Sequence, residues 1–239
     1  MTEILRVSKL NKRFGGVTVA RDIDFSLERG SMHCLIGPNG AGKSSFFRLL
    51  LGEHAPDGGS ILFRGEDITN LRSFRRIQRG ISVKFQVPGI FKALSVRQNL
   101  EVAFQKHLHG HNLTATVRRV LDFTGLLDQA AMPAGNLSHG QQQWLEIGMA
   151  VGVEPSLLLL DEPTAGMSPD ETRKTGEMLH DLNRRGITIL AVEHDMAFVE
   201  QIADRVTVLH VGAIYAQGTI GEIVAHPGVQ EIYLGTADA

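Results

Sequence analysis

The sequence has a single cysteine, Cys34, among its 239 residues. One cysteine excludes an internal disulfide and a zinc site built from cysteines, and it fits a reducing compartment. The simplest interpretation of Cys34 is a small apolar residue in a buried strand. The sequence also lacks a signal peptide and any apolar run near the ~20 residues that span a bilayer. We therefore expect a cytosolic protein unless a partner holds it at a membrane.

An excess of basic charge is missing as well. Lys and Arg number 24 and Asp and Glu number 26, which gives a formal net charge of -2. Nucleic-acid-binding proteins usually carry a clear basic excess, so we expect no nucleic-acid partner. The glycines are scattered, and no repeat or low-complexity segment marks a linker.

The hydrophobic pattern predicts alternating strands and helices. Strands are expected at 23–27, 32–36, 157–160 and 188–192. Helices are expected at 43–51, 96–104, 116–124, 141–151 and 170–184. Alternation of this kind builds a mainly parallel sheet that is covered on both faces. The expected fold is an α/β core with a β-rich N-terminal piece and a helical insertion between about 90 and 150.

Residues 37–44 read GPNGAGKS, a complete phosphate-loop pattern. Its glycines let the backbone turn successive N–H groups toward phosphate oxygens, and the helix that follows adds its positive N-terminal end. Lys43 can then reach the β- and γ-phosphates, and the Ser44 hydroxyl can bind Mg²⁺. A glycine-rich structural turn is the alternative, but the flanking strand and helix favour the phosphate loop. The predicted nucleotide-binding residues are Gly37, Pro38, Asn39, Gly40, Ala41, Gly42, Lys43, Ser44 and Ser45.

Two acidic residues, Asp161 and Glu162, follow the apolar run Leu157–Leu160. A buried strand would deliver both carboxylates to the sheet edge where ligands bind in open α/β folds. We expect Asp161 to hold Mg²⁺ and Glu162 to act as the general base for the attacking water. Acidic residues after a strand also commonly cap helices, so this interpretation depends on the phosphate loop.

A third motif narrows the class. Residues 137–143 read LSHGQQQ, which resembles the LSGGQ signature of ABC ATPases. In that family's order, Phe14 in KRFGG resembles the aromatic that stacks on adenine. Gln86 in VKFQ resembles the glutamine that touches Mg²⁺ and the attacking water, and His194 in VEHD the switch histidine that contacts the γ-phosphate. Taken singly, these three would more often be a core aromatic, a surface amide and a histidine at a strand end.

The resemblance covers essentially the whole chain and implies a specific architecture. It implies a phosphate-loop NTPase core with a mainly parallel sheet, an N-terminal antiparallel β subdomain and a helical ABC subdomain. The single ABC ATPase domain would divide into a core, residues 1–86 and 152–239, and a helical subdomain at about 87–151 that carries the signature.

The resemblance also implies a composite site. Two ATPases, either two copies or this chain and a paralogue, would pack head to tail with ATP between the phosphate loop of one and the signature of the other. Ser138, Gly140 and Gln141 would then bind the γ-phosphate in trans, at the start of a helix expected near Gln141. Two residues depart from the family pattern: His139 replaces the first glycine of the signature, and Ser168 stands where the D-loop usually has Asp.

The segments GQQQWLEIGMA, LLLLDEPTAGMSPDET and EIYLG resemble the ATPases of branched-chain amino acid and urea importers. Such a subunit would lie at the inner face of the cell membrane, with permease subunits as direct partners and a periplasmic solute-binding protein as an indirect one. The loop 87–91, VPGIF, would receive a short permease helix, and a packed surface loop is the alternative.

Two other interpretations remain. An ATPase of the same superfamily that acts on soluble partners would need no membrane subunit. Separately, the run Lys106–His111 contains His107, His109 and His111, which could bind a transition metal. No carboxylate or cysteine lies close by in sequence, so a solvated turn is the simpler expectation for this run.

Overall fold

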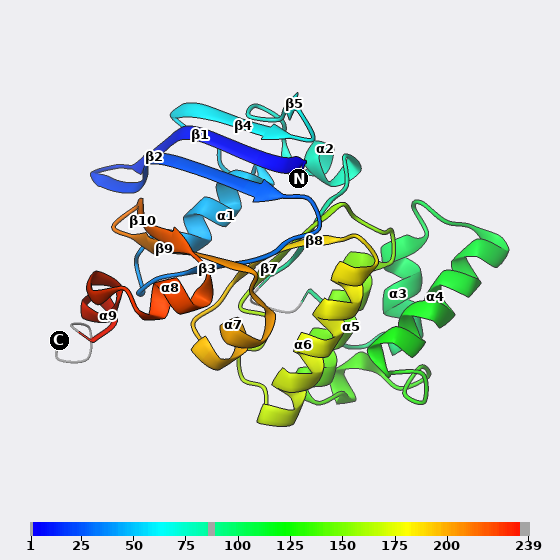
Figure 1. Ribbon diagram of the computed structural model, residues 1–239. Coiled ribbons are helices and arrows are strands. Elements are labelled where there is room, and N and C mark those ends of the chain that lie inside the picture. The colour runs from blue at the N-terminus through cyan, green and yellow to red at the C-terminus, as the bar shows by residue number, and fades with distance from the viewer. Residues whose placement is uncertain (1, 86–88, 235–239) are drawn as a thin grey trace.

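The computed structural model describes residues 2–85 and 89–234, and within them the strands form an antiparallel sheet and a mainly parallel sheet (Figure 1). The antiparallel sheet has the order β2-β1-β4-β5, with β1 Glu3–Phe14, β2 Val17–Glu28, β4 Gly58–Phe63 and β5 Glu66–Asp67. The other sheet has the order β10-β9-β3-β8-β7-β6, with β3 Met32–Ile36, β6 Ile81–Lys84, β7 Leu157–Asp161, β8 Thr188–Val192, β9 Arg205–His210 and β10 Ala213–Gly218. Only β10 is antiparallel to its neighbour in this sheet. The predicted fold class is confirmed.

Strand β7 is buried on both faces, as its run of four leucines predicts. Leu157 and Leu159 pack into a core that fills the space between the two sheets around α1, Lys43–Leu51. Leu158 and Leu160 pack on the opposite face, against α6, Pro169–Arg184, and α7, Met196–Ile202. Cys34 belongs to that second core and is fully buried, which raises the pKa of its thiol. The chain then ends in α8, Ile220–Val224, and α9, Pro227–Leu234.

The segment between β6 and β7 is helical and has its own hydrophobic core. It contains α3, Val96–Phe104, α4, Gly110–Thr124, a short 3₁₀ turn, Ala134–Asn136, and α5, His139–Val151. Apolar residues of all three α-helices meet in this core, among them Leu100, Phe104, Leu121 and Leu145. In Figure 1 these helices project from one side of the parallel sheet. No helix of the described residues is long and apolar enough to cross a bilayer.

The predicted start of α5 was wrong by two residues. The helix begins at His139 instead of Gln141, because Ser138 is its N-cap. The Ser138 hydroxyl accepts a hydrogen bond from the Gln141 N–H, and the Gln141 side chain accepts one from the Ser138 N–H. This reciprocal pair is a capping box, which the spacing of Ser and Gln already indicates in the sequence. Helix α4 likewise begins earlier than predicted, at Gly110 instead of residue 116.

The far end of α1 is held by one buried arginine. Arg76 of α2, Ser73–Gln78, is 1% exposed and donates to the carbonyl oxygens of Leu49, Leu50, Thr69 and Leu71 at 2.8 to 2.9 Å. The last carbonyls of a helix have no partner within the helix. Arg76 supplies a donor to the Leu50 carbonyl and a second donor to the Leu49 carbonyl, which also accepts from the Gly52 N–H. Because α1 starts at the phosphate loop, this contact fixes the helix that carries Lys43 and Ser44.

Replacing Arg76 should therefore destabilise the protein. We expect Arg76→Met to lower the free energy of unfolding by about 3 to 5 kcal/mol, because several buried carbonyls lose their donor together. Chemical denaturation measures the change. Arg75→Met on the same helix is the matched control, because Arg75 is exposed and should cost less than about 0.5 kcal/mol. Equal losses in the two variants would contradict the assignment.

Candidate active site

The phosphate loop joins β3 to α1 and has a backbone that only glycine fits. Gly37, Gly40 and Gly42 have φ angles of 148, 78 and 104°. A Cβ atom at Gly37 would lie 2.2 Å from the Leu209 carbonyl oxygen, and one at Gly42 would lie 2.5 Å from the Val19 carbonyl oxygen. Gly42 is the N-cap of α1 and offers no side chain to its first N–H groups. These groups are therefore free to bind phosphate oxygens.

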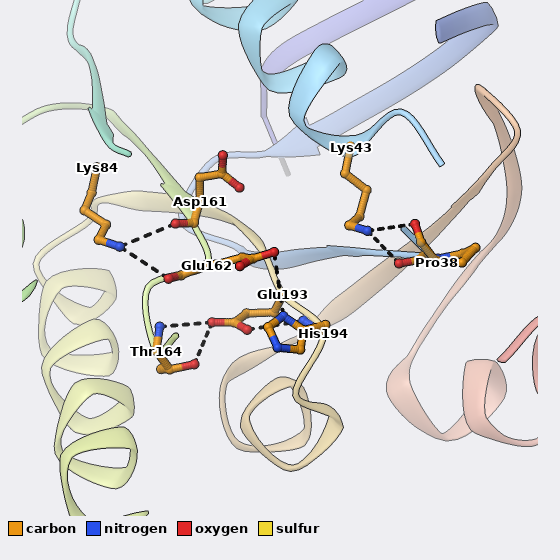
Figure 2. A network of polar contacts seen from close by, with 9 residues as sticks. Pro38, Lys43, Lys84, Asp161, Glu162, Thr164, Glu193 and His194 are labelled. Atoms are coloured by element: carbon orange, nitrogen blue, oxygen red, sulfur yellow. Dashed lines mark hydrogen bonds and ion pairs between the residues drawn. The ribbon is translucent and has the colours of Figure 1, made fainter. Parts of the chain in front are cut away.

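Lys43 folds back over this loop. Its Nζ donates to the carbonyl oxygens of Gly37 at 2.6 Å and Pro38 at 3.0 Å (Figure 2). Burial lowers the pKa of Lys43, while the charges of Glu162 and Asp161 raise it. A cleft of about 290 Å³ lies here and is lined by Val19, Asn39, Gly40, Ala41, Gly42, Lys43, Ser44, Ser45 and Glu162. The phosphate loop, Lys43 and Glu162 thus line one cleft.

Asp161 ends β7 and lies on the other side of Ser44. The two residues line a second cleft of about 210 Å³, together with Phe85, which directly follows β6. Burial and the charge of Glu162 raise the pKa of Asp161, and the nearby cations Lys84, Arg48 and Lys43 lower it. A hydroxyl and a carboxylate facing one cleft beside a phosphate loop are the ligand types that Mg²⁺ takes. The residues present therefore fit the cation predicted for this site.

Glu162 and His194 come from adjacent parallel strands, β7 and β8. The distance between Glu162 Oε1 and His194 Nδ1 is 3.7 Å, and the imidazole is 61% exposed. Glu162 has a φ of 46°, a left-handed conformation that is unusual for a residue with a side chain. Its N–H donates to the Val192 carbonyl at 3.0 Å. The predicted base and switch histidine thus meet at the C-terminal edge of the sheet.

A buried carboxylate beside this pair was not predicted. Glu193 is fully buried and accepts hydrogen bonds from the Thr164 hydroxyl at 2.8 Å and from the His194 N–H at 3.2 Å (Figure 2). Burial raises the pKa of Glu193, and the hydrogen bonds lower it. The residue ties the loop after β7 to the loop after β8. In the sequence, only its position next to His194 could have indicated that Glu193 belongs to the site.

One predicted residue, Phe14, lies at the margin of the described site. Phe14 ends β1, is 41% exposed and packs edge to face on His54 with 4.9 Å between ring centroids. Phe14 pairs with Val17 of β2 across the hairpin, and Val19, also in β2, lines the phosphate-loop cleft. Gln86 lies outside the described residues.

The signature residues contact a later segment of their own chain. The Ser138 hydroxyl donates to Glu171 Oε1 at 3.0 Å, and a Cβ at Gly140 would lie 2.4 Å from Glu171 Cδ. The two departures from the family pattern also meet this segment. His139 Nε2 is 2.9 Å from the Ala165 carbonyl oxygen, and Ser168 is the N-cap of α6, in a capping box with Glu171.

The histidines at 107, 109 and 111 do not form a metal site in the described structure. His107 and His109 are exposed between α3 and α4, and His111 lies in the first turn of α4. Within residues 2–85 and 89–234, no group of three or more His, Cys, Asp or Glu side chains is placed to hold a metal ion.

Comparison with known proteins identifies the family. Residues 20–165 match the family model described as ABC transporter. The branched-chain amino acid transport ATP-binding protein LivG of Escherichia coli K12 is 36% identical over 98% of both chains. The methionine import ATP-binding protein MetN of Rhizobium johnstonii is also 36% identical, over 94% of this chain and 63% of its own length.

The fold agrees with these relatives. The crystal structure of an ATP-binding cassette of an ABC transporter in its ADP conformation has a TM-score of 0.92 to this chain. It is 30% identical in sequence, and the match covers 98% of this chain and all of that one. A phosphate loop between β3 and α1, an acidic pair at the end of β7 and a signature at the start of α5 occur here on that fold. The chain therefore belongs to the ABC transporter family, as one of its ATPases.

Proposed function

We propose that this chain powers a membrane importer by binding ATP with Mg²⁺ and hydrolysing it between two ATPase subunits. The observation that carries the proposal is the meeting of Lys43, Ser44, Asp161 and Glu162 at the clefts beside the phosphate loop. Phe14 would stack on the adenine, and the phosphate-loop N–H groups would bind the phosphates.

The proposed hydrolysis uses six residues of this chain. Lys43 would neutralise charge on the β- and γ-phosphates, and Ser44 and Asp161 would hold the Mg²⁺, which when bound would offset the remaining charge. Glu162 takes a proton from the attacking water, which Gln86 helps to orient. His194, 3.7 Å from Glu162, contacts the γ-phosphate and keeps the base in place. These are positioning and electrostatic effects, which dominate phosphoryl transfer.

A second ATPase, identical or paralogous, completes the site in this proposal. Ser138, Gly140 and Gln141 begin α5, a helix of 13 residues whose N-terminal end attracts an anion. In the single chain Ser138 contacts Glu171 and the neighbouring His139 contacts Ala165, while other residues line the phosphate-loop cleft. Binding the γ-phosphate of a partner's ATP would give this helix end its ligand and would make ATP part of the interface.

The permease is proposed to dock beside the loop that contains Gln86. Phe85 and Phe91 flank this loop in sequence and are 43% and 52% exposed, so they offer apolar side chains to a partner. Val87 and Pro88 of the proposed docking loop lie outside the described residues. The proposed division into a core, 1–86 and 152–239, and a helical subdomain, 87–151, places this loop at the junction of the two. The subunit would act peripherally, on the cytoplasmic face of the membrane.

The proposed solutes are branched-chain amino acids, with urea and short amides as the other candidates. Sequence identity alone does not separate LivG from MetN, because both are 36% identical to this chain. Coverage does separate them, since LivG matches over 98% of its length and MetN over 63%. This full-length match supports the branched-chain assignment. A periplasmic solute-binding protein would deliver the solute to the permease.

Uptake measurements test the proposal. In a strain whose copy of this chain carries Lys43→Ala, uptake of radiolabelled leucine should fall to background, while labelled methionine enters at the normal rate. Labelled urea and acetamide extend the test to the other candidates. Normal uptake of all four would favour the alternative, an ATPase of this superfamily that acts on soluble partners. That alternative also predicts ATPase activity that a purified permease leaves unchanged.

A further inference from the structure

A fully buried lysine lies beneath the turn that carries the acidic pair. Lys84 ends β6, next to Leu160 of β7, and its side chain is 0% exposed. Its Nζ points to the main-chain oxygens of Asp161, at 3.4 Å, and Glu162, at 3.3 Å (Figure 2). Lysine is rarely buried without compensation, because removing an ammonium group from water is costly. The buried Lys84 ammonium therefore requires interactions that compensate for its lost hydration.

Negative charge surrounds this ammonium group. Burial lowers the pKa of Lys84, and the charges of Glu146, Asp161, Glu193 and Glu162 raise it. Two of these carboxylates, Glu146 and Glu193, are themselves buried. A buried cation among buried anions gains interactions in a medium of low dielectric constant that partly offset the loss of hydration. Lys84 is thus the shared cation of a cluster that joins β6, β7, β8 and α5.

Glu146 brings the signature helix into this cluster. It lies on α5, and its Oε1 accepts a hydrogen bond from the Gly89 N–H at 2.9 Å. Its Oε2 is buried and has no hydrogen-bond partner among the described residues. Burial raises the pKa of Glu146, and the Gly89 hydrogen bond and the charge of Lys84 lower it. Glu146 therefore links α5 to the segment after Gln86 and, through charge, to Lys84.

The turn that Lys84 supports is strained. Glu162 adopts a φ of 46°, which places a residue with a side chain in the left-handed region. Such conformations persist only where surrounding contacts enforce them. One contact is the hydrogen bond from the Glu162 N–H to the Val192 carbonyl. The ammonium of Lys84 supplies another, from the opposite side of the peptide unit.

We propose that Lys84 is a positioning residue for ATP hydrolysis, which holds the Asp161–Glu162 turn so that the Glu162 carboxylate faces His194 and the phosphate-loop cleft. The charge interaction between Lys84 and Glu146 extends this link to α5, so a movement of the signature helix would be transmitted to the base. The inference rests on the general-base role proposed for Glu162. It concerns a fully buried residue that acts through the backbone of its neighbours.

Lys84→Met tests the proposal, because it keeps the length of the side chain and removes the charge. We expect kcat to fall about 100-fold and KM for ATP to change less than about threefold, since a misplaced base slows chemistry while the phosphate loop is unaltered. The two constants are measured by steady-state ATPase assays with purified protein. A wild-type kcat would overturn the proposal.

A double variant separates positioning from stability. Lys84→Met leaves the buried charge of Glu146 without its cation, so Tm should fall, and adding Glu146→Gln should restore it. In Lys84→Met/Glu146→Gln, kcat should stay low, because the carbonyls of Asp161 and Glu162 still lack their donor. If kcat recovers together with Tm, Lys84 serves the fold alone and the proposal is overturned.

A second cycle tests whether Lys84 acts through Glu162. In a Glu162→Gln background, Lys84→Met should cause less than about a twofold further loss in single-turnover hydrolysis of radiolabelled ATP, because the group it positions is already absent. An additional 100-fold loss would overturn the proposal while leaving the base assignment intact. A wild-type rate in Glu162→Gln alone would overturn both together.

Discussion

Glu162→Gln is expected to lower kcat for ATP hydrolysis by about 10²- to 10⁴-fold and to trap a dimer in the presence of ATP and Mg²⁺. Glutamine keeps the shape of the side chain and removes the carboxylate that would accept the water proton. Lys43, Ser44 and the phosphate loop remain, so ATP should still bind. If hydrolysis is what releases the second subunit, the ATP-bound pair should accumulate, and size-exclusion chromatography measures it.

The control for this prediction lies on the other half of the composite site. Ser138→Arg places a bulky side chain at the N-terminus of α5, on the surface that a partner's ATP would approach. Combined with Glu162→Gln, it should abolish the trapped dimer and leave ATP binding to the single chain within about threefold of wild type. A Glu162→Gln chain that binds ATP and stays monomeric would argue that its partner is a paralogous ATPase. Wild-type hydrolysis by Glu162→Gln would contradict the assigned base.

Gly42→Ala is expected to lower kcat/KM for ATP by about 100-fold, because it displaces the backbone that binds the phosphates. The new methyl group would lie 2.5 Å from the Val19 carbonyl oxygen, and a φ of 104° is strained for alanine. Either the loop or β2 must move, and Val19 lines the same cleft. ATPase kinetics and titration with a fluorescent ATP analogue measure the loss.

Gly65→Ala is the matched control for the backbone effect. Gly65 also has a positive φ, of 81°, but a Cβ there meets no atom within 4 Å, and it lies in the turn between β4 and β5. We expect Gly65→Ala to cost about 1 kcal/mol of stability and to leave kcat/KM unchanged. Thermal unfolding of both variants shows whether Gly42→Ala is folded. A normal kcat/KM in folded Gly42→Ala would contradict the proposed phosphate-loop geometry.

The sequence predicted the elements whose signals are local. The runs Met32–Ile36 and Thr188–Val192 and the helix Lys43–Leu51 have the predicted bounds, because each is a short apolar or amphipathic segment between turn residues. Strands β9 and β10 were not predicted. They carry polar residues such as Thr207 and Gln217, which weaken the hydrophobic pattern of a strand. No local sequence pattern indicates that these strands pair with the rest of the sheet.

The polar groups beneath the site could not be predicted for a related reason. Lys84, Glu146 and Glu193 are far apart in the chain, and each resembles an ordinary surface residue in its local sequence. They meet because β6, β7 and β8 are neighbours and α5 packs beside them. The sequence pattern indicates that a strand exists but does not specify which strands lie next to it. The phosphate loop and the acidic pair were predictable because their function requires contiguous residues.

Glu171 has a consequence for how tightly two subunits hold each other. Hydrogen bonds from Ser168 and Ser138 keep the pKa of this carboxyl below its usual range, so it is an anion at neutral pH. The hydroxyl that would bind the partner's γ-phosphate therefore already serves an oxyanion of its own chain. When two subunits pair, the Ser138 hydroxyl would exchange the Glu171 carboxylate for a γ-phosphate oxygen as its acceptor. The gain in free energy would then be only the difference between these two hydrogen bonds. Once the phosphate has left, the Ser138 hydroxyl could again donate to Glu171, which would favour separation of the two subunits.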